Sequence, residues 1–181
     1  MTWKKITFLH LFGLLVLAGA CKDEVDPSMF EIYTGPISTG YDVNLYHSDS
    51  AIVRIHLQAK KQLEFDTGDQ EFPEGIDITF FDENGTITTT IRADKGFYMR
   101  NDNLYRGEGD VQVKNLEKEQ SLSSEEMFWD PNAQKIYTEK FVTVTDKKTI
   151  IKGTGLEADE GFNEYKIFKP FDSRMIIPGE N

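Results

Sequence analysis

The sequence predicts an all-β protein, and three observations lead to that prediction. Apolar and polar residues alternate over successive short segments, which is typical of half-buried β-strands. Turn signals rich in Asn, Asp, Gly and Ser separate these segments. No long stretch shows the apolar period of about 3.6 residues that marks an amphipathic helix. With 39% hydrophobic residues among 181, thirteen of them phenylalanine, the chain can bury a core of one domain.

Residues 1–20 predict a cleaved export signal. Lys4 and Lys5 precede the apolar run Ile6–Leu17, and the small residues 18–20 suit cleavage by a signal peptidase. The run is shorter than the roughly 20 apolar residues that a transmembrane helix needs. We therefore expect an exported protein whose fold begins after this segment.

Cys21 follows the signal directly and is the only cysteine. The stretch "LAGAC" resembles a bacterial lipobox, in which the cysteine becomes the lipidated first residue, although Ala18 stands where leucine is commoner. We expect lipidation of Cys21 and anchoring to a membrane of a Gram-negative envelope, at the inner membrane or alternatively the outer. An ordinary unpaired cysteine is the competing interpretation. The charges of residues 22–24 suit either a sorting tag or a solvated linker.

The charge balance excludes some classes of partner. The chain carries 20 Lys and Arg against 31 Asp and Glu, a formal charge of −11. Lys4 and Lys5 are the only charged residues in the signal, so its removal changes this charge to −13. Nucleic acid is a poor partner for such a surface, because phosphate contacts depend on cationic side chains.

After a tether at 21–40, six alternating segments predict strands. They are, in order, Tyr41–Leu45, Ala51–Ala59, Ile76–Phe80, Thr86–Arg92, Asp110–Lys114 and Phe141–Thr145. Their apolar faces are, in the same order, Tyr41/Val43/Leu45, Val53/Ile55/Leu57/Ala59, Ile76/Ile78/Phe80, Ile87/Thr89/Ile91, Val111/Val113 and Val142/Val144. Asn84-Gly85, between the third and fourth segments, is a strong hairpin signal.

A seven-residue pattern occurs three times: apolar, any, small, acidic, any, any, Phe. The copies are Ile91–Phe97, Leu122–Phe128 and Leu156–Phe162, at offsets of 31 and 34 residues. Repeats of this length are typical of stacked supersecondary units, so the pattern indicates a scaffold used several times.

The repeated residue types suit that interpretation. Small Ala93, Ser124 and Ala158 would allow close backbone approach where strands bend, and the acids that follow them suit hydrogen bonds at turns. The alternative is a carboxylate site for acid–base catalysis or a hard metal, which would require the acids to converge. These acids are Asp94, Glu125 and Asp159.

Two longer stretches carry a resemblance to a known family. "LYHSDSAIVRIHLQAKKQLEF" followed by "GIDITFFDENGTITTTIRADKGFYMRNDNLYRGEGDVQVKN" resembles the LptC family, the periplasmic component of the lipopolysaccharide export ABC transporter. "FWDPNAQKIYTEKFVTVT" and "IIKGTGLEADEGFNEYKI" are similar to the rest of that fold, which is shared with OstA-like relatives. The similarity covers about residues 41–169.

This resemblance implies a twisted, open β-jellyroll over 41–170, with 171–181 as a tail. It implies a carrier that is not an enzyme and needs no cofactor or metal. Such a carrier accepts lipopolysaccharide from the inner-membrane ABC transporter and passes it to a periplasmic bridge protein of the same fold. By the same analogy, Tyr41–Leu57 would face the transporter and Ile150–Phe168 the bridge. Many members hold an uncleaved transmembrane helix, from which Cys21 is a departure.

The candidate lipid-contacting residues are inward aliphatic and aromatic side chains, each of which could equally be ordinary core. They are Ile78, Phe80, Ile91, Phe97, Val111, Val113, Phe128, Ile136, Val142 and Val144. His47 and His56 lack partners at ligand spacing, so we expect polar-face residues rather than metal ligands. Trp129, beside the Asp130-Pro131 turn, is expected to be a structural plug.

Three other interpretations remain open. A soluble bridge-type OstA-like protein would share the fold but would not need Cys21. A structural or glycan-binding envelope lipoprotein should show clustered aromatic residues on its loops. A carbohydrate-active β-solenoid enzyme would need two acids facing each other across a cleft.

Overall fold

The computed structural model describes residues 33–175, and from Gly35 onward these form one compact unit. The expected signal segment, Cys21 and most of the expected tether lie outside the described residues, as do 176–181. Among the residues that are described, no helix is long and apolar enough to cross a bilayer.

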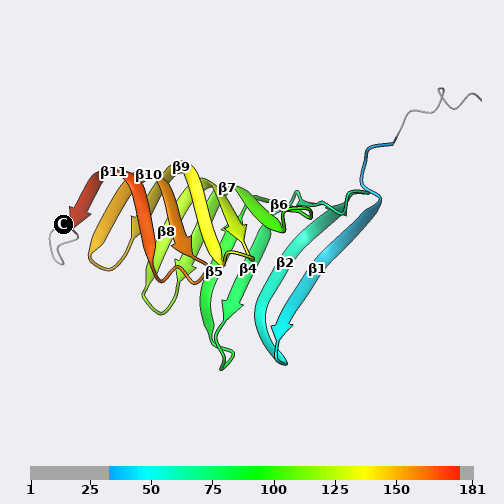
Figure 1. The fold of residues 1–181 in the computed structure, drawn as a ribbon, viewed down its shortest axis with the longest axis horizontal. Coiled ribbons are helices and arrows are strands. Elements are labelled where there is room, and N and C mark those ends of the chain that lie inside the picture. Colours follow the sequence, from blue (N-terminus) through cyan, green and yellow to red (C-terminus); the bar gives the residue numbers. More distant parts are fainter. Residues whose placement is uncertain (1–32, 176–181) are drawn as a thin grey trace, which may run out of the picture. The chain divides into compact units, whose positions relative to one another are not determined.

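Eleven antiparallel strands form one twisted sheet that does not close into a barrel (Figure 1). Within the described part, β1 pairs only with β2 and β11 only with β10, so these two strands are the free edges. The predicted all-β fold with open ends is therefore confirmed. The strands are β1 (Ser38–Asp49), β2 (Ile52–Glu64), β3 (Gln70–Phe72), β4 (Ile76–Phe81), β5 (Ile87–Ala93), β6 (Lys95–Met99), β7 (Leu104–Asn115), β8 (Gln120–Asp130), β9 (Lys135–Thr145), β10 (Thr149–Asp159) and β11 (Tyr165–Met175).

The sheet folds back on itself, because its strands break or bulge in one transverse band. The second half of β7 pairs with β5 and its first half with β6, so β5 and β6 are two arms of one strand bent at Asp94. Likewise β3 and β4 both pair with β2 and are separated by 73–75, where Gly75 has φ +101°. Each long strand therefore contributes to two layers. The first layer contains β4 and β5, and the second contains β3 and β6.

Bulges continue the bend through the remaining strands. The pairing register shifts at Glu108/Val111 in β7, at Ser124/Phe128 in β8 and at Thr154/Leu156 in β10. Gly109 (φ +75°) and Gly155 (φ +77°) adopt left-handed conformations at these shifts, which glycine allows at little cost. A bulge inserts unpaired residues and bends its strand. Aligned bulges thus bend the whole sheet.

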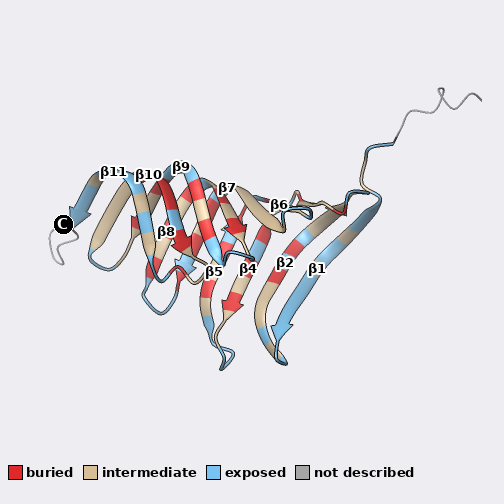
Figure 2. Ribbon diagram, viewed as in Figure 1, coloured by how far each residue is buried: buried red, intermediate tan, exposed pale blue. Residues whose placement is uncertain are grey.

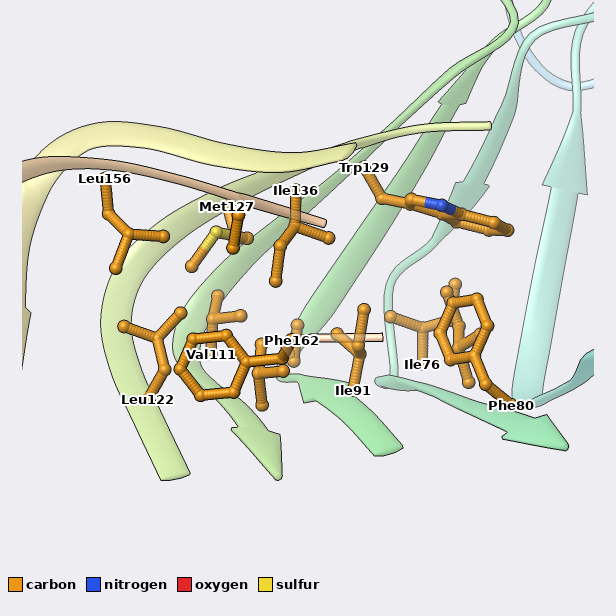
Figure 3. Packing of buried hydrophobic residues seen from close by; sticks show 14 of the residues in the cluster. Ile76, Phe80, Ile91, Val111, Leu122, Met127, Trp129, Ile136, Leu156 and Phe162 are labelled. Carbon is orange, nitrogen blue, oxygen red and sulfur yellow. The ribbon is translucent and has the colours of Figure 1, made fainter. Parts of the chain in front are cut away.

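Buried positions recur along the central strands of the sheet (Figure 2), and apolar side chains of the two layers face each other across the fold (Figure 3). In the first layer, cross-strand register aligns one apolar row over six strands. This row is Leu57, Ile78, Ile91, Val113, Leu122 and Val144, all at most 6% exposed. Met127, Trp129, Ile136 and Leu156 face it from the second layer.

Phe162 connects the two layers at one end. It lies in the turn between β10 and β11 and is fully buried (Figure 3). The Thr89 hydroxyl donates to the Gly161 carbonyl at 2.8 Å, and the Asn115 amide donates to the same oxygen at 2.9 Å. These two buried donors come from β5 and β7, so they fix the turn of the second layer against the first.

The predicted hairpin at Asn84-Gly85 is confirmed. Gly85 has φ +79°, and Asp82 Oδ1 accepts the backbone N–H groups of Asn84 and Thr86, each at 2.8 Å. Hydrogen bonding from the Thr86 N–H is the main cause that lowers the pKa of Asp82 below its usual value. The carboxylate thus closes the turn between β4 and β5.

The structure differs from the sequence interpretation in two places. By register, the β10 segment equivalent to Leu122–Ser124 is Ile151–Gly153, so Leu156–Phe162 is not a third structural copy. It lies beyond the bend, in the second layer. The part of the chain that forms the sheet also extends beyond the expected residues 41–170. Residues from Ser38 pair with the end of β2, and β11 continues to Met175.

Truncating the centre of the apolar row should destabilise the fold strongly. Leu122 is fully buried, so Leu122→Ala should lower the free energy of unfolding by about 2–5 kcal/mol through lost burial and a cavity. Leu116→Ala is the matched control: this residue is 49% exposed and its truncation should change stability by less than about 0.5 kcal/mol. Urea denaturation measures both. Equal effects would contradict the assignment of Leu122 to the core.

Candidate lipid seam and cleft

The apolar space between the layers, which we call the seam, is almost completely filled. Its lining comes from both layers and includes Ile78 and Ile91 from one, and Tyr105 and Met127 from the other. The free volume is about 20 Å³, room for roughly one water molecule. The seam is therefore closed in this structure, and a lipid chain could enter only if the layers or their side chains moved.

A large cleft opens beside the seam. Its volume is about 1110 Å³, and both layers line it: Ile55 and Phe80 from the first, Trp129 and Ala158 from the second, together with Tyr165 of β11. Its apolar floor is continuous with the core, because Phe80 and Trp129 meet edge to face with ring centroids 5.3 Å apart. The cleft is thus the open mouth of the folded sheet.

Charged side chains surround this mouth. Lys135 Nζ lies 2.6 Å from Glu157 Oε1, and Arg54 Nη2 lies 3.6 Å from Glu83 Oε1. Lys166 also lines the cleft. An apolar floor beneath a rim of both charges suits an amphiphile, whose chain needs a dry surface and whose headgroup needs a polar one.

Eight of the ten predicted lipid-contacting residues point inward and are at most 6% exposed. Ile78, Ile91 and Val111 line the seam, and Phe80 lines the cleft. The other four lie in the packed core: Val113, Ile136, Val142 and Val144. Contact of these residues with lipid stays a prediction.

The inward orientation expected for Phe97 and Phe128 is wrong. Both side chains are half-buried on the outer face, where Phe97 stacks against the Arg106 guanidinium at 4.4 Å and Phe128 against Tyr137 at 5.2 Å. The bend explains the difference, because it shifts the side-chain alternation by one residue in β5/β6 and in β8. In β5 the odd-numbered residues point inward, whereas in β6 the even-numbered ones do. In β8 the inward positions change from even to odd numbers at the bend.

The same shift explains why the alternation pattern did not place Met127 and Trp129 in the core, although Trp129 was expected to be a structural plug because it lies beside a turn. Met127 and Trp129 are buried although they alternate out of phase with Leu122 and Ser124. The alternation of apolar and polar residues did not by itself indicate this change of face. The Glu125-Glu126 pair, which interrupts the alternation, is the only hint of a bulge at this point.

The three repeated acids do not converge on one site. Asp94 and Glu125 line a hollow on the outer side of the bend, whereas Asp159 lies at the cleft, where it accepts the backbone N–H groups of Asn163 and Glu164. Asp159 thus has the turn-closing role predicted for these acids. Asp94 instead pairs with Arg92 at 3.3 Å.

The predicted polar roles of the histidines agree with their surroundings. His56 stacks on Tyr46 at 4.1 Å, and its Nε2 lies 3.1 Å from Asn44 Oδ1. His47 lines the cleft. In the described part of the chain, no group of three or more His, Cys, Asp or Glu side chains is placed to hold a metal ion.

Burial raises the pKa of Tyr105 to about 12, with a smaller contribution from Tyr98. Folding therefore opposes formation of the phenolate. Stability from this group is complete below pH 10, the ordinary tyrosine value, and is lost as the pH rises towards 12, by up to roughly 3 kcal/mol.

Tyr105→Phe should remove this alkaline loss of stability. Urea denaturation at pH 9 and pH 11.5 should show a smaller decrease for the variant than for the parent protein. Tyr46→Phe, at a ring that is 62% exposed, serves as the control and should follow the parent. If Tyr105→Phe and the parent lost the same stability between pH 9 and pH 11.5, burial would not be raising the pKa of Tyr105.

A protein family whose model matches this chain was found by comparison with known proteins. Residues 39–167, from β1 into β11, match the family model described as lipopolysaccharide-assembly, LptC-related. A search among curated proteins finds no match. The family is a non-enzymatic transport component that acts in lipopolysaccharide assembly and transport in the cell envelope. The match covers most of the chain and confirms the resemblance seen in the sequence: the chain belongs to the LptC-related family.

Proposed function

We propose that this protein carries lipopolysaccharide from an inner-membrane ABC transporter to a periplasmic bridge protein, with the acyl chains held between the two layers. The observation that supports this most is an apolar seam that lies next to a cleft lined by both layers, with Trp129 between them. Each buried methylene is worth about 0.8 kcal/mol, so even partial entry of a chain would contribute substantially to binding. The closed seam would have to open for this purpose.

The free edges support the proposed partners. β1 and β11 are 12 and 11 residues long, and each leaves one side of its backbone unpaired within the described part. Large apolar side chains are exposed along both, including Tyr41 (70%) and Phe171 (66%). An exposed edge is a template for the strand of another chain. We assign β1 to the transporter and β11 to the bridge protein, by analogy with the family.

The anchor is the remaining part of the proposal. Lipidation of Cys21 would hold the domain at the inner membrane, with the outer membrane as the alternative. Sixteen residues lie between Cys21 and β1, and a flexible chain of that length would span roughly 22 Å, enough to let the domain reach a partner. Mass spectrometry of the purified protein tests this directly. A mature chain that begins at an unmodified Cys21, or a chain that still begins at residue 1, would contradict the proposed lipid anchor.

Photocrosslinking in cells tests the lipid path. A benzophenone amino acid at Phe80 or Ile55, which line the cleft from inside, should give lipopolysaccharide adducts that disappear when the ABC transporter is de-energised. Thr79 and Gln112, which alternate with inward residues on β4 and β7, are the matched controls and should give none. If none of the four sites gave adducts, although the protein is folded and the cells are rich in lipopolysaccharide, the apolar face would be ordinary core and the proposed lipid path would be wrong.

The same reagent tests the edges. At Tyr41 it should capture a transporter subunit, and at Phe171 the bridge protein. Adducts with these partners in the reverse order would overturn the assignment of the edges but not the transport role.

A further inference from the structure

Trp129 occupies a singular position between the two spaces described above. Within the described residues, it is the one side chain that lines both the cleft and the seam. It is only 6% exposed and closes the inner end of a cleft about 1110 Å³ in volume. Figure 3 shows its indole ring across from Phe80, at the end of the row of buried side chains. Anything that passes from cleft to seam at this point must pass the indole.

Three contacts hold the indole in place, and they differ in kind. Phe80 meets it edge to face at 5.3 Å, and Tyr105 stacks on it at 4.8 Å with an interplanar angle of 25°. The third contact is polar: indole Nε1–H donates to Glu160 Oε2 at 3.3 Å. Glu160 is positioned by its own backbone, whose N–H donates to the Gln134 carbonyl at 3.0 Å. One surface carboxylate in the β10–β11 turn therefore secures the ring.

The balance of these contacts makes displacement of the ring feasible. A lipid chain that enters the seam can replace the apolar contacts of Phe80 and Tyr105 with contacts of its own, so this part of the exchange is nearly neutral. The contact that a lipid chain cannot replace is the hydrogen bond to Glu160, which at 3.3 Å is slightly longer than the usual range and borders the cleft. That bond is consequently the main contact specific to the closed state.

The backbone at Trp129 would not need to move. Trp129 pairs with Ile136 and Asp130 with Lys135, and Asp130 Oδ1 accepts the N–H groups of Asn132 and Ala133 at 2.9 and 3.0 Å. The turn that follows the strand is thus closed by its own hydrogen bonds. A change of side-chain rotamer towards the cleft is the motion that leaves these bonds intact, and the cleft has the room to receive the ring.

We propose that Trp129 is the gate between the cleft and the seam, latched by Glu160, and that an acyl chain of lipopolysaccharide enters the seam as the indole swings into the cleft. This gate rests on the proposed function, since it regulates entry to the same lipid site. It provides an entry to a seam that has only about 20 Å³ of free space until the layers part. It also assigns Glu160 a role that is independent of the charge of the rim.

The chain offers a direct optical test, because Trp3 and Trp129 are its only tryptophans. The proposed mature, lipidated protein has lost Trp3 with the export signal, so after reconstitution in phospholipid nanodiscs it reports on Trp129 alone; Trp3→Phe gives the same single reporter if residues 1–20 are retained. Addition of purified lipopolysaccharide should raise acrylamide quenching of this single tryptophan. In a parallel preparation, a benzophenone amino acid at Ile78 should record lipid entry to the seam independently.

Two variants of Glu160 distinguish the effect of its hydrogen bond to Trp129 from the effect of its negative charge. Glu160→Ala removes the acceptor and should speed adduct formation at Ile78 by up to about fivefold, the equivalent of one ordinary hydrogen bond. Glu160→Gln removes the charge but keeps an acceptor oxygen, so it should behave like the parent. Near-ultraviolet circular dichroism confirms that both remain folded.

The outcomes distinguish the gate from the transport role. Lipid adducts at Ile78 without any change in quenching of Trp129, or equal rates for the parent and both Glu160 variants, would overturn the gate and leave the proposed function intact. Equally fast entry in both Glu160 variants would attribute the effect to charge and also overturn the latch. Absence of seam adducts in every folded variant would overturn the proposed function, and the gate with it.

Discussion

The transverse band of bulges is the constraint on which the rest of the structure depends. A sheet of eleven strands that stayed flat would expose the apolar row from Leu57 to Val144 to water. The register shifts in β7, β8 and β10, with left-handed Gly109 and Gly155, bend it so that the row meets a second layer made by the same strands. One chain thereby forms a two-layered core without a second sheet.

This way of closing a core has a functional consequence. Because the layers are joined along the bend and the sheet is not closed into a barrel, they end in a mouth on another side, the cleft beside Phe80 and Trp129. The edge strands β1 and β11 stay unpaired within the described residues, since no barrel closes on them. An apolar interior beside an open cleft, with two free edges, suits the carrier that we propose. The family to which the protein belongs is a non-enzymatic component of lipopolysaccharide assembly and transport.

Alternation predicted six of the strands, which are parts of β1, β2, β4, β5, β7 and β9, but not β3, β6, β8, β10 or β11. It failed where the backbone departs from a regular strand. Ile78, Ile91 and Val111 were placed correctly because each lies in an uninterrupted run. Phe97 and Phe128 were placed on the wrong face because the bend shifts the alternation by one residue. The same shift made Leu156–Phe162 look like a third repeat, although register places it in the other layer. Trp129 could not be recognised as the junction, because its role depends on Phe80 and Glu160, which lie far away in sequence.

The central claim is that the two layers part to admit lipid, and the distance across the mouth tests it most directly. Spin labels attached to a ketone-bearing amino acid at Asn84, in the β4–β5 turn, and at Ala133, which lines the opposite side of the cleft, leave Cys21 unchanged. Double electron–electron resonance on the full chain in nanodiscs should show a longer, broader distance distribution after purified lipopolysaccharide is added. An unchanged distribution under conditions where lipopolysaccharide is bound would contradict the claim, because the closed seam has no room for a chain.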